Sequence, residues 1–249
     1  MATIKVDDLW LTYPVIMESG SMRKAIMTAL LGGAGTKKEN NIINVDAIRG
    51  ISFEIKDGDR LALIGHNGAG KTSLLRVLAS IYEPTAGSVE IDGKVESLID
   101  VGFGLEMEET GWENIKFILT LLGRPGDSIE SDAKEIADFC ELGEFLDLPV
   151  RTYSTGMQTR LSFAISTNIE PEILLMDEMI GAGDYRFQEK AQKRIDDLAK
   201  KTRIIVLASH SEPLIKEWCE KAIWLEKGEI VGIGNPGEIW NSYVNSMRL

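Results

Sequence analysis

The chain has 249 residues, a net charge of −12 and 44% hydrophobic residues, enough to form a sizeable core in one large domain or two small ones. The acidic balance disfavours nucleic acid as a partner, because a phosphate backbone selects basic surfaces. No apolar run approaches the ~20 residues that span a bilayer, and no secretory signal opens the chain, so we expect a cytoplasmic protein. The two cysteines, Cys140 and Cys219, form no motif that predicts a disulfide or a zinc site.

The first part of the chain predicts strands around an insertion. Residues 4–11 form a first strand, and residues 14–45 form an irregular insertion. Within it, the apolar spacing of residues 22–31 predicts an amphipathic helix, which either contacts a membrane or a partner or packs on its own core. The alternation in residues 51–55, the turn at Asp57-Gly58 and the apolar residues 61–64 together predict a hairpin.

Residues 65–72 read G-H-N-G-A-G-K-T, the pattern of a phosphate-binding loop. An apolar strand precedes the loop and a helix-like run follows it, so an ordinary glycine-rich turn explains the pattern less well. The glycines let backbone N–H groups surround phosphate oxygens, and the helix start adds its positive end. Lys71 is expected to bridge the β- and γ-phosphates, and the Thr72 hydroxyl to bind Mg²⁺. The predicted nucleotide-binding residues here are Gly65, His66, Asn67, Gly68, Ala69, Gly70, Lys71, Thr72 and Ser73.

The rest of the chain alternates between strand and helix signals. Residues 85–102 read as turns and short strands, residues 111–163 as helices, and residues 173–176 and 204–208 as buried strands. Two apolar runs around Lys227-Gly228 predict another hairpin, and Pro236 is expected to start a short helix. This alternation predicts an α/β fold with a mainly parallel sheet and an antiparallel β subdomain.

Polar side chains follow the two buried strands. Asp177 and Glu178 end the first, and His210 follows the second. Open α/β sheets bind ligands at the carboxyl ends of their strands. We therefore expect Asp177 to hold Mg²⁺, Glu178 to act on the attacking water and His210 to contact the γ-phosphate.

Residues 153–158, Y-S-T-G-M-Q, resemble the signature loop of ABC ATPases, whose common form is L-S-G-G-Q. The loop lies between the phosphate loop and Asp177, as in that family, and the resemblance covers essentially the whole chain. It implies one ABC ATPase domain over residues 1–249, a P-loop NTPase core with a helical subdomain inserted at about 105–165. It also implies that two copies of the chain sandwich two ATP molecules, each between the Lys71 loop of one copy and the signature loop of the other. The signature residues expected to bind ATP are Ser154, Thr155, Gly156 and Met157.

Other positions match the family less strictly. Tyr13 aligns with the aromatic residue that stacks on adenine, although a plain core or edge aromatic is the alternative. Residues 181–184 resemble the loop that contacts the opposite subunit, and His210 matches the switch histidine. One departure concerns the glutamine that contacts Mg²⁺ and the transporter: no Gln occurs between Lys71 and Ser154, and Glu106 takes its place. A carboxylate there can bind metal but adds negative charge beside the phosphates.

Details of the signature, of residues 101–115 and of residues 181–188 resemble the ATPase subunits of polysaccharide exporters. The resemblance implies ATP-driven export of an O-antigen-like, lipid-linked glycan, capsule or teichoic acid through a separate membrane permease. That permease would handle the glycan. The helical subdomain of this chain would bind the permease at the cytoplasmic face of the bacterial inner membrane. Because the chain stops at Leu249, it is expected to lack the C-terminal carbohydrate-binding domain of some O-antigen members. Two alternatives stay open: an ATPase for another export cargo, such as a lipid or drug, and a soluble ABC ATPase without a transport role.

Overall fold

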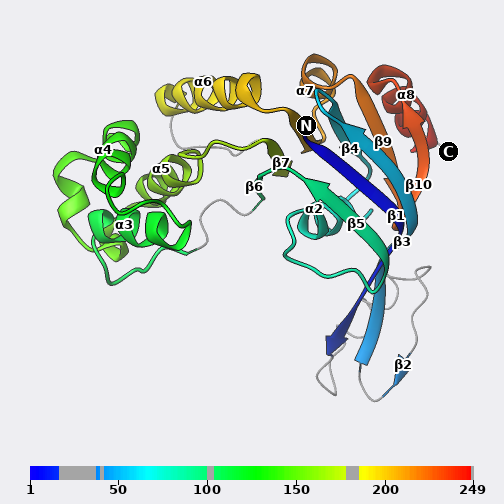
Figure 1. The fold of residues 1–249 in the computed structure, drawn as a ribbon, viewed down its shortest axis with the longest axis horizontal. Coiled ribbons are helices and arrows are strands. Elements are labelled where there is room, and N and C mark those ends of the chain that lie inside the picture. Colours follow the sequence, from blue (N-terminus) through cyan, green and yellow to red (C-terminus); the bar gives the residue numbers. More distant parts are fainter. Residues whose placement is uncertain (17–37, 40–41, 100–103, 178–184, 248–249) are drawn as a thin grey trace. The chain divides into compact units, whose positions relative to one another are not determined.

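The computed structural model describes residues 1–16, 38–39, 42–99, 104–177 and 185–247. The chain divides into two compact units (Figure 1). We call Met1–Ser97, Glu172–Glu178 and Arg203–Leu249 the core unit, and Leu98–Pro171 with Met179–Thr202 the helical unit. Among the described residues, no helix has the length and apolar character that crossing a bilayer requires. The amphipathic stretch predicted at residues 22–31 lies outside the described residues.

The core unit contains a four-stranded antiparallel sheet in the order β2-β3-β1-β5. Its strands are β1 (Thr3–Ile16), β2 (Lys38–Glu39), β3 (Ile42–Lys56) and β5 (Ala86–Asp92). The long pairing of β1 with β3 includes Val15 with Ile43 and Tyr13 with Val45. Residues 14–16 and 42–45 are therefore strand, and the prediction of an irregular insertion was wrong at both its ends.

The second sheet has the order β10-β9-β4-β8-β7-β6. Its strands are β4 (Arg60–Ile64), β6 (Val95–Leu98), β7 (Ile173–Asp177), β8 (Ile204–Ala208), β9 (Lys221–Glu226) and β10 (Glu229–Gly234). Strands β7, β8, β4 and β9 are parallel neighbours. Because both faces of such strands are covered, their sequences are nearly continuous apolar runs rather than alternating ones. The predicted combination of a mainly parallel sheet and an antiparallel subdomain is confirmed.

The predicted hairpin between residues 51–55 and 61–64 was wrong. These segments belong to different sheets: β3 pairs with β1, whereas β4 has the parallel strands β8 and β9 as its two neighbours. A tight turn does join them, with the Asp59 amide donating to the Lys56 carbonyl at 2.9 Å. Local turn chemistry is the same whether or not the flanking strands pair, so the sequence signal could not distinguish the two arrangements.

Among its described residues, the core unit has the helices α2 (Lys71–Leu78), α7 (Glu212–Trp218) and α8 (Pro236–Ser246). As predicted, β9 and β10 form a hairpin and Pro236 opens the last helix. The Asn235 side chain caps that helix by accepting from the Gly237 amide at 2.9 Å. Trp224 of β9 packs edge-on against Tyr243 of α8, with ring centroids 6.0 Å apart, so the helix covers the end of the sheet that β9 and β10 form.

The helical unit contains α3 (Gly111–Leu121), α4 (Ile129–Cys140), α5 (Thr155–Ser166) and α6 (Tyr185–Lys201), with two short 3₁₀ turns, η1 (Gly143–Asp147) and η2 (Val150–Thr152). Its core is formed by apolar residues at helical spacing, among them the fully buried Ile115, Ile136 and Leu161. Helix α3 begins directly after its N-cap residue Thr110, because Thr110 and Glu113 form a reciprocal capping box that satisfies amides which would otherwise lack partners.

Candidate functional site

The phosphate loop connects β4 to α2 in the core unit. Helix α2 begins at Lys71, and its N-cap residue Gly70 has a left-handed backbone (φ 108°) with no side-chain cap. Gly68 also has a positive φ of 83°. A helix start without a capping side chain leaves its amides and its positive dipole end to a ligand, and the preferred ligand is an anion.

Lys71, the first residue of α2, is only 7% exposed. Its Nζ donates to the carbonyl oxygens of Gly65 at 2.7 Å and His66 at 3.2 Å. The same Nζ lies 3.3 Å from Nε2 of His210, which follows β8. The predicted phosphate-loop lysine and the predicted histidine are therefore adjacent. A cation and an imidazole at this point can both reach an anion bound by the loop.

Thr72 and Asp177 are also brought together. The Thr72 hydroxyl donates to Oδ2 of Asp177 at 2.5 Å, across 105 residues of sequence. The sheet explains this contact, because Ala208 of β8 is in register with both Leu63 of β4 and Asp177 of β7. The carboxyl ends of the three strands thus lie side by side. A hydroxyl and a carboxylate in contact are hard oxygen donors of the type that Mg²⁺ selects, so these residues fit such an ion.

The loop's remaining residues have mixed roles. His66 bonds through Nδ1 to the carbonyl of Asn67 at 2.7 Å and is half-buried. Ala69 is buried, and its carbonyl accepts from the Gly228 amide at 3.0 Å, which ties the loop to the β9–β10 turn. Tyr13 lies on β1 and is 38% exposed. Glu178 and residues 181–184 lie outside the described residues.

The signature residues belong to the helical unit and start α5. Ser154 is the N-cap of this helix, and its Oγ accepts from the Met157 amide at 3.3 Å. Ser154 and Thr155 are exposed, whereas Gly156 and Met157 are half-buried. A Cβ added at Gly156 would meet only the Ser154 Oγ, at 4.0 Å. The start of α5 is thus a second helix N-terminus whose surroundings leave space for a ligand.

Glu106 also belongs to the helical unit. Its side chain is exposed, and its backbone is held by Asn114, which is 1% exposed. The Glu106 amide donates to the Asn114 Oδ1 at 2.7 Å, and the Asn114 Nδ2 donates to the carbonyls of Glu106 and Thr110, each at 2.9 Å. Our sequence reasoning missed this role of Asn114. The available signal was that Asn114 lies at helical spacing from Gly111 and Ile118, on the face that also carries the buried Ile115, where a buried polar group requires partners.

The fold and the Lys71–Thr72–Asp177 constellation define a nucleotide-binding protein of the P-loop class. The sequence profile described as ABC transporter matches residues 48–181, more than half of the chain. The chain therefore belongs to the ABC transporter family, as one of its ATP-binding ATPase subunits. The fold agrees with solved structures of such subunits. For the dimeric post-hydrolysis structure of the ATP-binding cassette MJ0796 bound to ADP and Pi, the TM-score is 0.68 at 21% identity, covering 94% of this chain and 98% of that one.

Relatives at higher identity belong to polysaccharide export systems. The chain is 44% identical to the O-antigen export system ATP-binding protein RfbE of Yersinia enterocolitica, covering 92% of this chain and 97% of that protein. It is 37% identical to the teichoic acids export ATP-binding protein TagH of Lactococcus lactis over 96% of this chain. The chain spans about half the length of TagH and of the Myxococcus xanthus O-antigen export protein RfbB, to which it is 36% identical.

Proposed function

We propose that this chain hydrolyses ATP to power the export of a bacterial cell-surface polysaccharide, such as an O-antigen-like glycan, through a separate membrane permease. The observation that carries the cargo assignment is the 44% identity to an O-antigen export ATP-binding protein over 97% of that protein's length. An ATPase for a lipid or drug would have the same nucleotide site, so the site alone does not select the cargo. The chain would act at the cytoplasmic face of the inner membrane, bound to the permease.

The site residues suggest a division of roles in hydrolysis. Lys71 would bind the β- and γ-phosphates, and His210, 3.3 Å from its Nζ, would contact the γ-phosphate. Thr72 and Asp177 would hold Mg²⁺, which neutralises charge that develops on the phosphate oxygens. Glu178 would orient or deprotonate the attacking water. Tyr13 would stack on adenine, and Glu106 would lie near the metal.

The two helix starts, at Lys71 and at Thr155, suggest a dimer. One phosphate loop and one signature loop per chain make two complete sites when two copies face each other with ATP between them. The Ser154 hydroxyl, the Gly156 amide and the start of α5 of one copy would then meet the γ-phosphate bound by the other. Binding of ATP would close the pair, and hydrolysis would weaken it.

A test of this cycle uses Glu178→Gln, which should bind ATP, nearly stop turnover and accumulate a dimer measured by light scattering after gel filtration. Adding Ser154→Arg should restore the monomer without loss of ATP affinity, because the added side chain occupies the contact with the second copy. A Glu178→Gln chain that stays monomeric with saturating ATP contradicts the dimer.

A second experiment tests the cargo. A strain lacking the chain should lose its surface glycan, regain it when the wild-type chain is supplied and not regain it with Lys71→Ala.

The permease would dock on an acidic groove of the helical unit. This groove of about 420 Å³ is lined by Glu106, Glu108, Glu109, Glu113, Asn114 and Phe117. Phe117 is 47% exposed, so the groove also offers an apolar contact. Hydrogen bonding and repulsion from Glu113 raise the pKa of Glu109, whereas the Thr110 hydroxyl and amide lower the pKa of Glu113. Crowded carboxylates of this kind favour a cationic partner, so we expect a basic cytoplasmic segment of the permease.

Charge reversal tests this docking. Glu109→Lys should abolish co-purification with the permease while the ATPase activity of the isolated chain stays within about twofold of wild type, since the interaction is electrostatic and local. Glu144→Lys, an equal charge change at an exposed η1 position outside the groove, is the matched control. Equal loss of co-purification in both variants would show that net charge alone, and not the groove, controls the association.

A further inference from the structure

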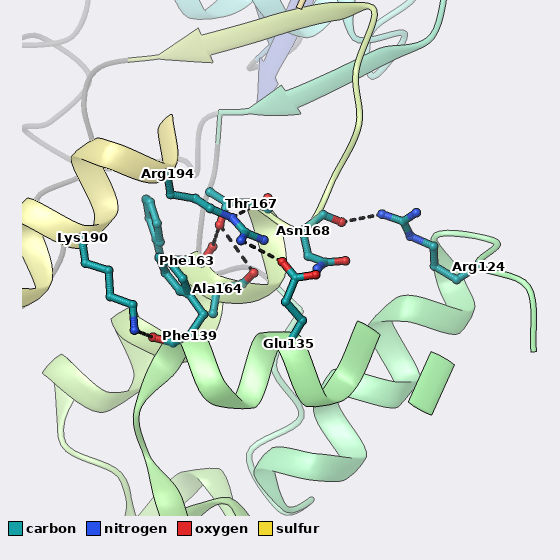
Figure 2. Close-up of polar contacts among 9 residues, drawn as sticks. All are labelled: Arg124, Glu135, Phe139, Phe163, Ala164, Thr167, Asn168, Lys190 and Arg194. Carbon is teal, nitrogen blue, oxygen red and sulfur yellow. Dashed lines mark hydrogen bonds and ion pairs between the residues drawn. The ribbon is translucent and has the colours of Figure 1, made fainter. Parts of the chain in front are cut away.

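Arg194 of α6 joins three helices of the helical unit. Its Nε donates to the carbonyl of Thr167 at 3.3 Å, and Thr167 is the C-cap of α5. Its Nη1 bonds to Oε1 of Glu135 on α4 at 2.8 Å. Figure 2 shows Arg194 reaching from α6 toward both partners. The side chain is 22% exposed, so water screens these bonds only in part. A cation at the C-terminal end of α5 also complements the negative end of that helix dipole.

Lys190, one turn earlier on α6, makes a parallel set of contacts. Its Nζ donates to the carbonyl of Phe139 at 2.9 Å and to Oε1 of Glu141 at 2.6 Å, at the C-terminal end of α4. Both cations lie over the Phe139 ring, with Lys190 Nζ at 4.7 Å and Arg194 Cζ at 5.0 Å from its centroid. Residues four apart share one face of a helix, so this face of α6 is directed at α4 and α5.

An aromatic cluster lies beside these ion pairs. Phe139 of α4, Phe163 of α5 and Phe187 of α6 contact one another, with ring centroids 5.7 to 6.0 Å apart. Phe163 and Phe187 are buried. Each helix contributes one ring, and buried rings in contact resist displacement because cores are close-packed. Helices α4, α5 and α6 therefore form one body.

Two helices of this body flank β7 in the chain: α5 precedes the strand, whose last residue is Asp177, and α6 follows it. Residues 168–172 join Thr167 to the start of β7, and residues 178–184 join its end to α6. Arg194 thus bonds α6, the helix that follows β7, to Thr167, the α5 residue from which the chain continues to β7. The same body includes α5, which begins next to Ser154. At about 1.5 Å per residue, the 12 residues of α5 carry a change at the Thr167 end about 18 Å to the Ser154 end.

We propose that Arg194 is a positioning residue for ATP hydrolysis: it fixes α6 to the C-terminal end of α5, so that displacement of the segments flanking β7 moves the helix that presents Ser154. The inference rests on the proposed ATP cycle, in which Asp177 binds the metal and Ser154 meets the nucleotide of the second copy. Arg194 itself touches neither. Without its bonds, α6 would keep its packing through Phe187 and Lys190 but would lose its hydrogen bond to the C-terminal end of α5, so the two helices would be less firmly aligned.

The chain supplies a matched control in Arg124. Its Nη2 donates to the carbonyl of Asn168 at 2.6 Å, and its Nε pairs with Asp132 of α4 at 3.8 Å. Like Arg194, it joins the end of α5 to a carboxylate of α4, and its side chain is 25% exposed. Arg124, however, belongs to the connection between α3 and α4 (Figure 2). Removing it loosens the same end of α5 without releasing α6.

The experiment compares Arg194→Gln with Arg124→Gln in the full chain. Arg194→Gln should lower kcat about 10-fold or more, because misplacement of about 1 Å far from the chemistry can cost up to about 100-fold. Its ATP affinity should stay within about twofold of wild type, since the phosphate loop is in the other unit. Arg124→Gln should keep kcat within about twofold, and Arg194→Lys should recover part of the loss, because an ammonium can still bond to both partners. Equal losses of kcat in the two glutamine variants would overturn the proposal.

Hydrogen exchange in the absence of nucleotide gives a second readout. Amides of α6 should exchange faster in Arg194→Gln and not in Arg124→Gln, because only the former removes bonds made by α6. Unchanged α6 exchange in Arg194→Gln overturns the proposal whatever the activity, whereas an inactive wild type would instead contradict the proposed ATP cycle. Should either glutamine variant fail to fold, Glu135→Gln and Asp132→Asn remove the ion pairs of the two arginines from the α4 side. They leave the bonds to Thr167 and Asn168, so the losses of kcat should follow the same order with a smaller magnitude.

Discussion

Replacing Gly65 by alanine is expected to destabilise the core unit much more than replacing Gly68, although both glycines belong to the same phosphate loop. A Cβ at Gly65 would lie 2.3 Å from the carbonyl oxygen of Leu225 and 2.9 Å from the Cβ of Ala69. Leu225 is part of β9, whose neighbours β4 and β10 hold it on both sides. The clashing oxygen is therefore backbone within a sheet and cannot move aside alone.

The magnitude follows from this geometry. Overpacking costs about 1–3 kcal/mol where neighbours can adjust, and a contact about 1 Å too short against fixed backbone lies at or above the upper end of that range. At Gly68 (φ 83°), an added Cβ would meet nothing within 4 Å, so Gly68→Ala costs only backbone strain, for which we take the lower end of the usual range, about 1 kcal/mol. We expect about 3 kcal/mol or more for Gly65→Ala and about 1 kcal/mol for Gly68→Ala.

Urea and thermal denaturation, each followed by far-UV circular dichroism, measure both values without nucleotide. In a chain of this size, a difference of about 2 kcal/mol corresponds to roughly 4–8 °C in Tm, well above the error of the measurement. Equal destabilisation by the two substitutions would refute the reasoning. It would mean that the loop does not lie against β9, and that the requirement for glycine comes from backbone conformation alone.

Three further predictions concern stability and reactivity. Phe163→Ala should reduce the free energy of unfolding by about 3–5 kcal/mol in urea titrations, since this ring is fully buried between two others; a loss below about 1 kcal/mol would contradict the aromatic cluster. Burial raises the pKa of the Cys219 thiol to about 12. Alkylation of Cys219 near pH 8 should therefore be slower than that of a free thiol by on the order of a thousandfold, because only the thiolate reacts. Alkylation at the rate of a free thiol would be inconsistent with that burial. Burial alone would raise the pKa of Asp59, but hydrogen bonds from Lys221 and the Lys56 amide outweigh burial and lower this pKa. The stabilisation that this carboxylate contributes is therefore present above the ordinary aspartate pKa and is lost as the pH falls through the lowered pKa. The stabilities of Asp59→Asn and wild type should accordingly differ near pH 7 and converge once the pH falls below the lowered pKa of Asp59. A difference that stays constant with pH would assign the effect to something other than ionisation.

The sequence alone determined the parts of this protein that depend on local chemistry. The phosphate loop, the strand before it and the helix after it can be recognised because glycine conformation, the missing cap and the apolar runs all act within a few residues. The apolar runs at residues 173–176 and 204–208 indicated central parallel strands, because only strands covered on both faces are apolar throughout. Because Asp177 and His210 follow these runs in the sequence, their positions at the carboxyl ends of the two strands could be predicted as well.

Only the tertiary structure decided which distant residues meet. It placed β3 and β4 in different sheets, against the hairpin that their turn indicated, since strand pairing depends on all the neighbours competing for an edge. It also set the Thr72 hydroxyl on Asp177, packed Gly65 against Leu225, and brought Arg194 to the end of α5. Contacts of this kind arise from register and packing between segments far apart in the chain, and no pattern within one segment contains them.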